Sequence, residues 1–249
     1  MNDKRYLIIS CEILFREVCF CVSKSKHIVD VSFQKKGLHD IGEASMSKAL
    51  QDVIEQVDYD KYNAILLCYG LCNNGIRNLH APIPIVVPRA HDCITLLMGS
   101  KEKYDDYFFN NIGTYFHSSG WLERDKNSNE TAGSIIQQLG IDKSHADYVE
   151  EYGEENADYL MSILGNWLVN YNKVAFINNG IGDIRGNAEK SKKFAEQNNW
   201  DYEEVEGNIS LIERLVDGDW DEVDFLIVPP NHTIEPTNDS SVFTYVSLD

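Results

Sequence analysis

The sequence predicts an α/β protein built from two doubly wound, mostly parallel-sheet units that face a cleft. Three observations support this fold class. Short apolar runs alternate with amphipathic helical patterns in both halves of the chain. Several of the runs are apolar throughout, which is typical of strands covered on both faces. Polar or glycine-rich loops follow the runs, and doubly wound folds build ligand sites from such loops.

The first half begins with a compact apolar strand and alternates from there. The mixed segment 12–23 starts either a helix or a second strand. A helix is predicted over residues 43–57, where apolar residues recur at helical spacing. A second helix is predicted over residues 94–110, after a strand bounded by prolines. Strands are predicted over residues 6–10, 27–33, 62–68 and 84–87.

The second half repeats the alternation after a polar stretch. Residues 118–133 are polar and predict a linker or an excursion, and helical patterns follow over 131–139 and 143–170. Strands are then predicted over residues 173–177, 201–205 and 224–228, with helices over 187–199 and 209–216. We therefore expect three parts: an α/β unit over 1–120 that carries the Cys/His motifs, a helical connection over 121–170, and a second α/β unit over 171–249.

The charge and hydropathy of the chain narrow the classes of partner. Lys and Arg total 22 against 40 Asp and Glu, for a net charge of −18. Such a surface repels phosphate backbones and anionic membranes, so no nucleic-acid or membrane partner is expected. No apolar run approaches the roughly 20 residues of a membrane helix. Without a secretory signal, six cysteines indicate a reducing cytoplasm with thiols that are free, metal-bound or redox-active.

Three cysteines and a histidine follow predicted strands. Cys11 ends the first strand, Cys72 lies in YGLCNNG (69–75), and His91 and Cys93 lie in PRAHDCITLLMGS (88–100). If these strands are parallel neighbours, their carboxyl ends share one sheet edge. Thiolates and an imidazole there suit zinc or another thiophilic metal. The sequence therefore predicts a zinc site with Cys11, Cys72, His91 and Cys93 as ligands.

Each of these residues also has a plainer interpretation. His91 suits a hydrogen-bonded turn, Cys11 and Cys93 suit packing, and Asp92 suits a helix cap. The main rival to the metal is a reactive thiol at Cys72 or Cys93, because the start of a helix should lower the pKa of Cys93. The remaining cysteines lie in apolar stretches and are expected in the core: Cys19, Cys21 and Cys68.

Other polar residues are candidates for ligand binding or proton transfer. Glu12, beside Cys11, suits a general base or a partner of a metal ligand, and His39 in GLHD suits proton transfer or a capping turn. The residues expected to contact a substrate are Gly70, Asn73, Gly75 and Arg89. In the second half Asp183, Arg185 and His232 also follow strands, where turn roles explain most such residues.

The motifs CE, GLHD, YGLCNNG, PRAHDCITLLMGS, GTYFHSSGW and LIERLVDGDWDEVDFLIVPPN resemble a bacterial and archaeal family known as domain of unknown function 1638. The resemblance covers nearly the whole chain. It implies occurrence in anaerobes beside corrinoid-dependent methyltransferase systems, and hence a role in one-carbon metabolism. The chain lacks the D-x-H-x-x-G corrinoid-binding motif, so we do not expect it to carry cobalamin itself.

Two functions remain open from the sequence. In the first, the protein binds zinc and is a zinc-thiol methyl or group transferase, with Glu12 or His39 moving protons. In the second, it is a non-catalytic accessory protein that holds a small molecule or a metal for a methyltransferase system. Both place a small-molecule ligand in the cleft between the two units.

Overall fold

The computed structural model describes residues 4–124, 149, 153–154, 156 and 171–248, with the backbone alone at positions 39 and 40. Its sheets are mostly parallel, which confirms the predicted fold class. Most of the expected linker and the helices expected over 131–139 and 143–170 lie outside the described residues. No helix among the residues described is long and apolar enough to cross a membrane.

The larger sheet, sheet A, has the strand order β2-β1-β3-β4-β8, and its first four strands are parallel. The central strands β3 and β4 are buried at every residue, as expected for strands with helices on both faces. The bounds are β1 Arg5–Cys11, β2 Ile28–Gln34, β3 Ala64–Cys68, β4 Ile85–Pro88 and β8 Phe225–Val228.

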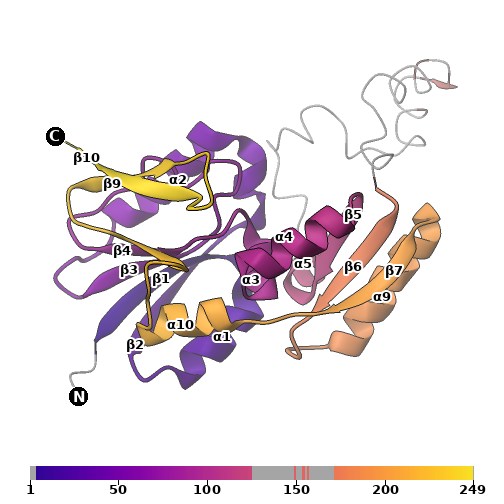
Figure 1. The fold of residues 1–249 in the computed structure, drawn as a ribbon, viewed down its shortest axis with the longest axis horizontal. Helices are drawn as coiled ribbons and strands as arrows, with labels where there is room; N and C mark the ends of the chain where they lie inside the picture. The colour runs from indigo at the N-terminus through magenta and orange to yellow at the C-terminus, as the bar shows by residue number, and fades with distance from the viewer. Residues whose placement is uncertain (1–3, 125–148, 150–152, 155, 157–170, 249) are drawn as a thin grey trace.

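Helices cover both faces of sheet A (Figure 1). The segment expected to be a helix or a strand at 12–23 is helical, as η1 (Glu12–Leu14) and α1 (Phe15–Lys24). Helix α1 packs beside α10 (Ser210–Asp217) on one face. Helix α2 (Glu43–Glu55) covers the other and buries Met46, Leu50 and Ile54, four residues apart, in the core. The short helix η2 (Lys36–Ile41) joins β2 to α2.

The smaller sheet, sheet B, has the order β5-β6-β7 and is entirely parallel. Its strands are β5 (Thr114–Ser118), β6 (Lys173–Asn178) and β7 (Asp201–Glu206), and α9 (Ile184–Asn198) packs on β6 and β7. Helix α5 (Ser119–Arg124) follows β5 and contacts η1 of the larger unit. The ribbon places sheet B beside sheet A, with α4 between them (Figure 1).

The strand pairing corrects the expected unit boundaries. β8 pairs antiparallel with β4, so the chain returns to sheet A after β7 instead of completing a second unit over 171–249. The antiparallel pair β9 (His232–Pro236) and β10 (Phe243–Ser247) follows β8 within the larger unit. β5, expected in the first unit, pairs with β6. The apolar sequence FLIV of β8 indicates that the strand is buried. It does not indicate which sheet the strand joins, or at which edge.

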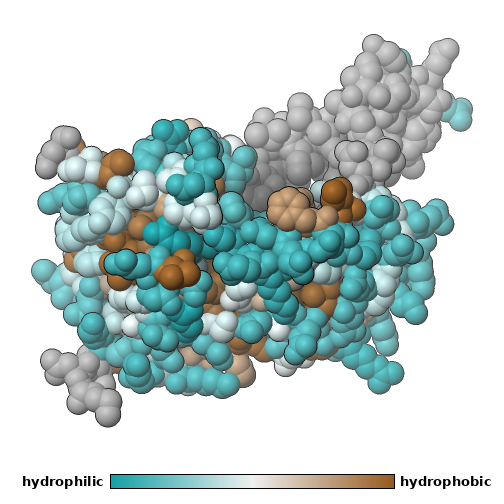
Figure 2. Space-filling view, viewed as in Figure 1, coloured by the Kyte–Doolittle hydropathy of each residue, from teal (hydrophilic) through white to brown (hydrophobic). Residues whose placement is uncertain are grey.

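The helix expected over 94–110 is two helices. α3 (Cys93–Met98) ends at Gly99, whose φ of 82° is left-handed, and α4 (Lys101–Asn110) begins after Ser100. The Ser100 side chain caps α4 by accepting a hydrogen bond from Lys103 N. Apolar side chains are exposed over the end of α4, within a face that is otherwise mostly hydrophilic (Figure 2).

Candidate functional site

A pocket of ≈600 Å³ lies where the two sheets meet. Its described lining includes the ends of β1 and β3, the loops that follow β3 and β4, and most of β5. Much of the lining is aliphatic or aromatic. The aromatic lining residues are Tyr69, Tyr104, Phe108, Tyr115, Phe116, Trp121 and Tyr171.

The structure brings three of the four predicted metal ligands to this pocket. Cys11, Cys72 and Cys93 line it, together with Cys68. Backbone hydrogen bonds join the two motif loops, from Leu71 N to the carbonyl of residue 90 at 2.8 Å and from Cys72 N to that of residue 91 at 2.9 Å. The thiols converge because β1, β3 and β4 are parallel neighbours in the sheet.

The loop that carries Cys72 is a left-handed turn. Cys72, Asn73 and Asn74 have φ values of 46°, 56° and 63° in succession, and Gly75 N closes the turn on the Cys72 carbonyl at 3.1 Å. A side-chain-bearing residue pays roughly 1–2 kcal/mol for this conformation, and asparagine tolerates it best. Backbone strain of this kind clusters at functional sites. Cys72 and Asn73 both line the pocket.

The two glycines of this loop serve close packing. A Cβ on Gly70 would lie 2.6 Å from the backbone of Asp92, and one on Gly75 would lie 2.1 Å from Met46 Sδ. Neither glycine is among the described lining residues. The structure thus supports Asn73 as a ligand-contact candidate and gives Gly70 and Gly75 a packing role instead.

Two of the pocket thiols, Cys72 and Cys93, have raised pKa values. Burial raises the pKa of Cys72 to about 12, with smaller contributions from Cys11 and Asp92. Burial also raises the pKa of Cys93 well above its usual value, aided by Asp92, Cys72 and Cys11. The expectation that a helix start lowers the pKa of Cys93 is therefore wrong. α3 has six residues, and the loss of water together with nearby negative charge outweighs its dipole. These thiols are protonated near neutral pH, which disfavours a metal-free nucleophile.

Asp92 is a helix cap, as one interpretation of its position predicted. Its carboxylate accepts hydrogen bonds from Ile94 N at 2.9 Å and Thr95 N at 3.2 Å. It also accepts one from the Tyr104 hydroxyl at 2.9 Å, so protein donors contact both of its oxygens.

His91 does not join the thiols. Its side chain is exposed and is not among the described lining residues, because its backbone carbonyl faces Cys72 N while its neighbour Asp92 turns inward to cap α3. Within the described part of the chain, no three His, Cys, Asp or Glu side chains are close enough to hold a metal ion. The zinc site stays a prediction.

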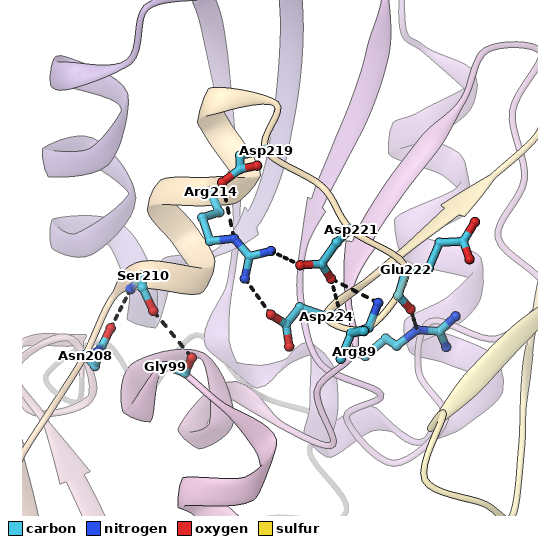
Figure 3. Close-up of polar contacts among 10 residues, drawn as sticks. Arg89, Gly99, Asn208, Ser210, Arg214, Asp219, Asp221, Glu222 and Asp224 are labelled. Carbon is cyan, nitrogen blue, oxygen red and sulfur yellow. Dashed lines mark hydrogen bonds and ion pairs between the residues drawn. The ribbon is translucent and has the colours of Figure 1, made fainter.

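Arg89 has a structural role. Its guanidinium donates hydrogen bonds to the backbone carbonyls of Ser241 at 2.7 Å and Phe243 at 2.6 Å. It donates a third, shown in Figure 3, to the carbonyl of Glu222 at 3.1 Å. These contacts tie the end of β4 to the segment around β10 and lie outside the described pocket lining. The expected substrate contact at Arg89 is therefore not supported.

The two proton-transfer candidates lie near the rim. The Glu12 carboxylate accepts a hydrogen bond from Lys36 N at 3.0 Å and lies 3.9 Å from Arg124 Nη1. It is not among the described lining residues. His39 lies in η2, which begins with Lys36, and its side chain is outside the described residues.

Sequence reasoning missed the basic and aromatic part of the site. Lys35 and Lys36 line the pocket, and Lys36 Nζ lies 4.8 Å from the centre of the Trp121 ring. A signal was present for the lysines, because they directly follow the strand expected over 27–33 and so fall on the carboxyl edge of the same sheet. Trp121 lies in α5, which follows β5 of sheet B, and its approach depends on how the two sheets meet.

A buried carboxyl lies between the two units. Glu17 of α1 is 1% exposed, and its Oε2 has no hydrogen-bond partner. Burial raises its pKa to about 7. Asn179, after β6, lies close enough to lower this pKa in part, although the two side chains form no hydrogen bond of ordinary geometry. The sequence signal was its place in the apolar stripe of α1, between Leu14 and Cys21.

The carboxyl edge of sheet B is polar. A hollow of ≈530 Å³ there is lined by Asn178, Asn179, Gly180, Glu204, Glu206 and Gly207. Of the second-half candidates, Asp183 caps α9 by accepting a hydrogen bond from Gly186 N at 3.0 Å. Arg185 pairs with Glu189 at 3.5 Å on the same helix. His232 Nδ1 lies 3.0 Å from the carbonyl of Pro230 in the turn before β9. All three thus have local structural roles.

Comparisons with known proteins give a family for the chain. No curated protein and no solved structure matched it. The model of one family, described as "Protein of unknown function (DUF1638)", matches residues 33–216. That range is most of the chain and includes both cysteine-bearing loops after β3 and β4. The protein belongs to this family, as its motifs predicted.

Proposed function

We propose that the protein binds a small, largely apolar organic molecule in the pocket between sheets A and B. The observation that carries the proposal is the pocket itself, ≈600 Å³ in volume and lined mainly by aliphatic and aromatic side chains. Ligand pockets in proteins are commonly about 300–1,000 Å³, apolar, and furnished with a few polar groups that fix orientation. This is the binding function that the sequence left open as the alternative to catalysis.

The polar groups of the pocket suit a binding role. Asn73 offers an amide from the left-handed turn, and Thr114 and Ser118 offer hydroxyls from β5. These groups come from both sheets, so a ligand that contacts them also bridges the two units. The strained turn at Cys72 supports the same conclusion, because folding retains such strain where it positions a functional side chain.

A thiophilic metal, most simply zinc, is a second candidate occupant. The observation that favours it is that Cys11 at the end of β1, and Cys72 and Cys93 after β3 and β4, line one pocket beside three adjacent strands. A bound zinc ion would stabilise the thiolates and so offset the effect of burial on their pKa values. Binding would require the side chains to come closer together than they lie here. Zinc, when bound, would supply a Lewis acid to a ligand in the pocket.

Transferase activity and a corrinoid methyltransferase partner rest on the family resemblance alone. Both stay predictions, and neither is needed for the binding proposal.

Binding is tested with the neutral apolar dye N-phenyl-1-naphthylamine, followed by fluorescence. We expect wild-type protein to bind it saturably and Ile94→Trp, which fills the pocket, to weaken binding about tenfold or more. Ile209→Trp is the matched control, because Ile209 packs on the same core but is not among the described lining residues. No saturable binding by the wild type, or equal binding by both variants, would contradict the proposal.

The metal candidate is tested by elemental analysis of untagged protein purified without chelator. Zinc near one ion per chain, lost in Cys72→Ser but kept in Cys19→Ser, would support it. Cys19 is the matched control because it lies outside the described lining. His91→Ala should leave the metal content unchanged. Zinc retained in Cys72→Ser and lost in His91→Ala would place the site elsewhere.

A further inference from the structure

Tyr69, the first residue of the loop YGLCNNG, has a buried hydroxyl that the protein leaves without a partner. The residue is 3% exposed and lines the pocket. Within the described part of the chain, its hydroxyl oxygen is buried and has no hydrogen-bond partner. Most buried polar groups in folded proteins are hydrogen-bonded, because burial removes their hydrogen bonds to water. A ligand in the pocket would supply the partner that the protein does not.

The hydroxyl of Tyr69 lies near the thiols of the pocket. Burial raises the pKa of Tyr69 well above its usual value, and Cys11, Cys72 and Cys68 lie close enough to contribute. All three cysteines line the pocket as well. The phenol is therefore neutral near physiological pH, and its O–H group is a hydrogen-bond donor.

The side chains around this hydroxyl favour an acceptor as its partner. Burial raises the pKa of both Cys68 and Cys72 to about 12, so these thiols keep their protons and are weak S–H donors. The carboxylate of Asp92, the acidic side chain of the described lining, already accepts hydrogen bonds from the start of α3 and from the Tyr104 hydroxyl. The ligand group that complements this region is thus an acceptor.

We propose that the ligand of this pocket carries a neutral carbonyl group, to whose oxygen the Tyr69 hydroxyl donates a hydrogen bond. This inference rests on the proposed binding function and names the chemical class of the ligand. A carboxylate fits less well, because a buried charge needs several donors or a counter-charge, and Glu12 adds negative charge near the hydroxyl. Because the hydroxyl oxygen is buried, the contact requires a shift of neighbouring side chains, which is common at binding sites.

The test compares two ligands of the same shape, 2-acetylnaphthalene and 2-isopropenylnaphthalene, in which an oxygen replaces a methylene. Displacement of N-phenyl-1-naphthylamine measures their affinities for wild-type protein and for Tyr69→Phe. We expect the variant to bind the ketone about threefold to tenfold more weakly, the effect of losing one neutral hydrogen bond. Its affinity for the alkene should be unchanged or higher. Wild-type protein should bind 2-naphthoate more weakly than the ketone.

Tyr59→Phe is the matched control. The Tyr59 hydroxyl donates a hydrogen bond to the carbonyl of Ile54 at 2.8 Å, and Tyr59 is not among the described lining residues. This variant should keep the wild-type affinity for both ligands. Without ligand, Tyr59→Phe should lower the urea midpoint of unfolding. Tyr69→Phe should leave the midpoint unchanged or raise it, because it removes a buried hydroxyl that has no partner among the described residues.

A measurement on wild-type protein alone covers the case in which Tyr69→Phe folds poorly. The C=O stretch of isotope-labelled 2-acetylnaphthalene is followed by infrared difference spectroscopy. It should lie at a lower frequency in the complex than in hexane, because a hydrogen bond weakens the C=O bond. A bound ketone with the frequency that it has in hexane would overturn the proposal.

The outcomes separate this inference from the proposed function. If the dye binds but Tyr69→Phe affects the ketone and the alkene equally, the carbonyl contact is wrong and the apolar pocket stands. Tighter binding of naphthoate than of the ketone would overturn the neutral ligand. A urea midpoint lowered as much by Tyr69→Phe as by Tyr59→Phe would show that the Tyr69 hydroxyl already has a partner in the protein, and would also overturn the inference. If neither the dye nor the alkene binds to wild-type protein, the proposed function itself fails.

Discussion

The two sheets present different carboxyl edges, although both are built from parallel strands. The edge of sheet A ends in thiols, forms the floor of an apolar pocket of ≈600 Å³, and is closed by residues from sheet B. The edge of sheet B ends in amides and carboxylates such as Asn178 and Glu204, around a polar hollow of ≈530 Å³. At that second edge Asn178 Nδ2 donates a hydrogen bond to Glu204 Oε1 at 2.7 Å.

The difference shows how the covering of a carboxyl edge changes the chemical environment of its residues. Parallel pairing brings loop residues to one edge in both sheets. Whether that edge is covered then determines the properties of its side chains. Burial raises the pKa of thiols, and it makes polar groups without a hydrogen-bond partner unfavourable. The edge of sheet A is covered and is therefore the stronger candidate for ligand binding.

The largest expected effect concerns the thiols of the covered edge. Burial takes the pKa of Cys72 from 9.0 to about 12, which lowers its thiolate fraction near neutral pH about a thousandfold. Iodoacetamide should therefore alkylate Cys72 in folded protein far more slowly than in urea-unfolded protein, as followed by peptide mass spectrometry. Equal rates in both states would mean that water reaches this edge, and the contrast with sheet B would fail.

The next effect concerns the contact that joins the two edges. A Cβ on Gly120 of α5 would lie 1.7 Å from the carbonyl oxygen of Ile13 in η1. Gly120→Ala should therefore lower the free energy of unfolding by about 3 kcal/mol or more, since backbone must move. It should also weaken dye binding, because the neighbouring Trp121 lines the pocket. Urea unfolding measures the first effect and fluorescence the second.

Gly180→Ala is the matched control on the open edge. Gly180 has a φ of 70° and no neighbouring atom within 4 Å of an added Cβ. The substitution should lower the free energy of unfolding by about 1 kcal/mol, because alanine disfavours the left-handed backbone at this position. Binding of the dye should be unchanged. Similar losses for both variants would show that the units are not in close contact at α5.

Glu17, between the two units, should make stability depend on pH. The pKa of its carboxyl is raised from 4.5 to about 7 in the folded protein. As pH rises, Glu17 therefore loses its proton at a lower pH in the unfolded chain than in the folded one. The contribution of the protonated carboxyl is complete below pH 4.5 and is lost as pH rises through 7. The loss in unfolding free energy is up to about 3 kcal/mol.

The variant Glu17→Gln should remove that slope, as measured by urea unfolding at pH 5 and pH 8. Glu196→Gln, at an exposed position of α9, should keep the wild-type slope. A Glu17→Gln variant with the wild-type slope would assign the pH dependence to another group.

The smallest expected effect tests whether Arg89, which follows β4, belongs to the ligand site. Arg89→Met removes hydrogen bonds to the carbonyls of Ser241 and Phe243, which flank Val242, a buried residue with a left-handed φ of 67°. We expect a loss of about 2 kcal/mol in unfolding free energy, with binding of N-phenyl-1-naphthylamine unchanged. Unchanged stability with lost binding would instead return Arg89 to the ligand site.

The sequence predicted the site as far as topology determines it. Cys11 ends a short apolar strand, and Cys72 and Cys93 follow two others. These strands are parallel neighbours in sheet A, so the convergence of the thiols on one edge followed from parallel pairing. His91 lies two residues before Cys93 and is exposed, because Asp92 between them has an extended backbone and turns its side chain inward to cap α3. Spacing alone does not specify such a local turn.

The arrangement of the two sheets was less predictable. The strand FLIV is as apolar as its neighbours, and nothing in it indicates that it returns to β4 in the antiparallel direction. The position of Trp121 over Lys36 depends on that arrangement as well. Pairing between distant segments is decided by how whole faces pack, which short patterns do not encode.

Because the chain returns to sheet A only at β8, the completion of this sheet is delayed during synthesis. β4 is buried at all four of its residues and acquires its second neighbour only when β8 is made, since Val86 pairs with Ile227. At about 5–20 residues per second, a ribosome needs roughly 7 to 28 s to cover that distance. For this interval the nascent protein exposes an unpaired apolar strand edge, a template for aggregation. A chaperone that shields β4 until residue 228 has emerged from the ribosome should therefore raise the folding yield.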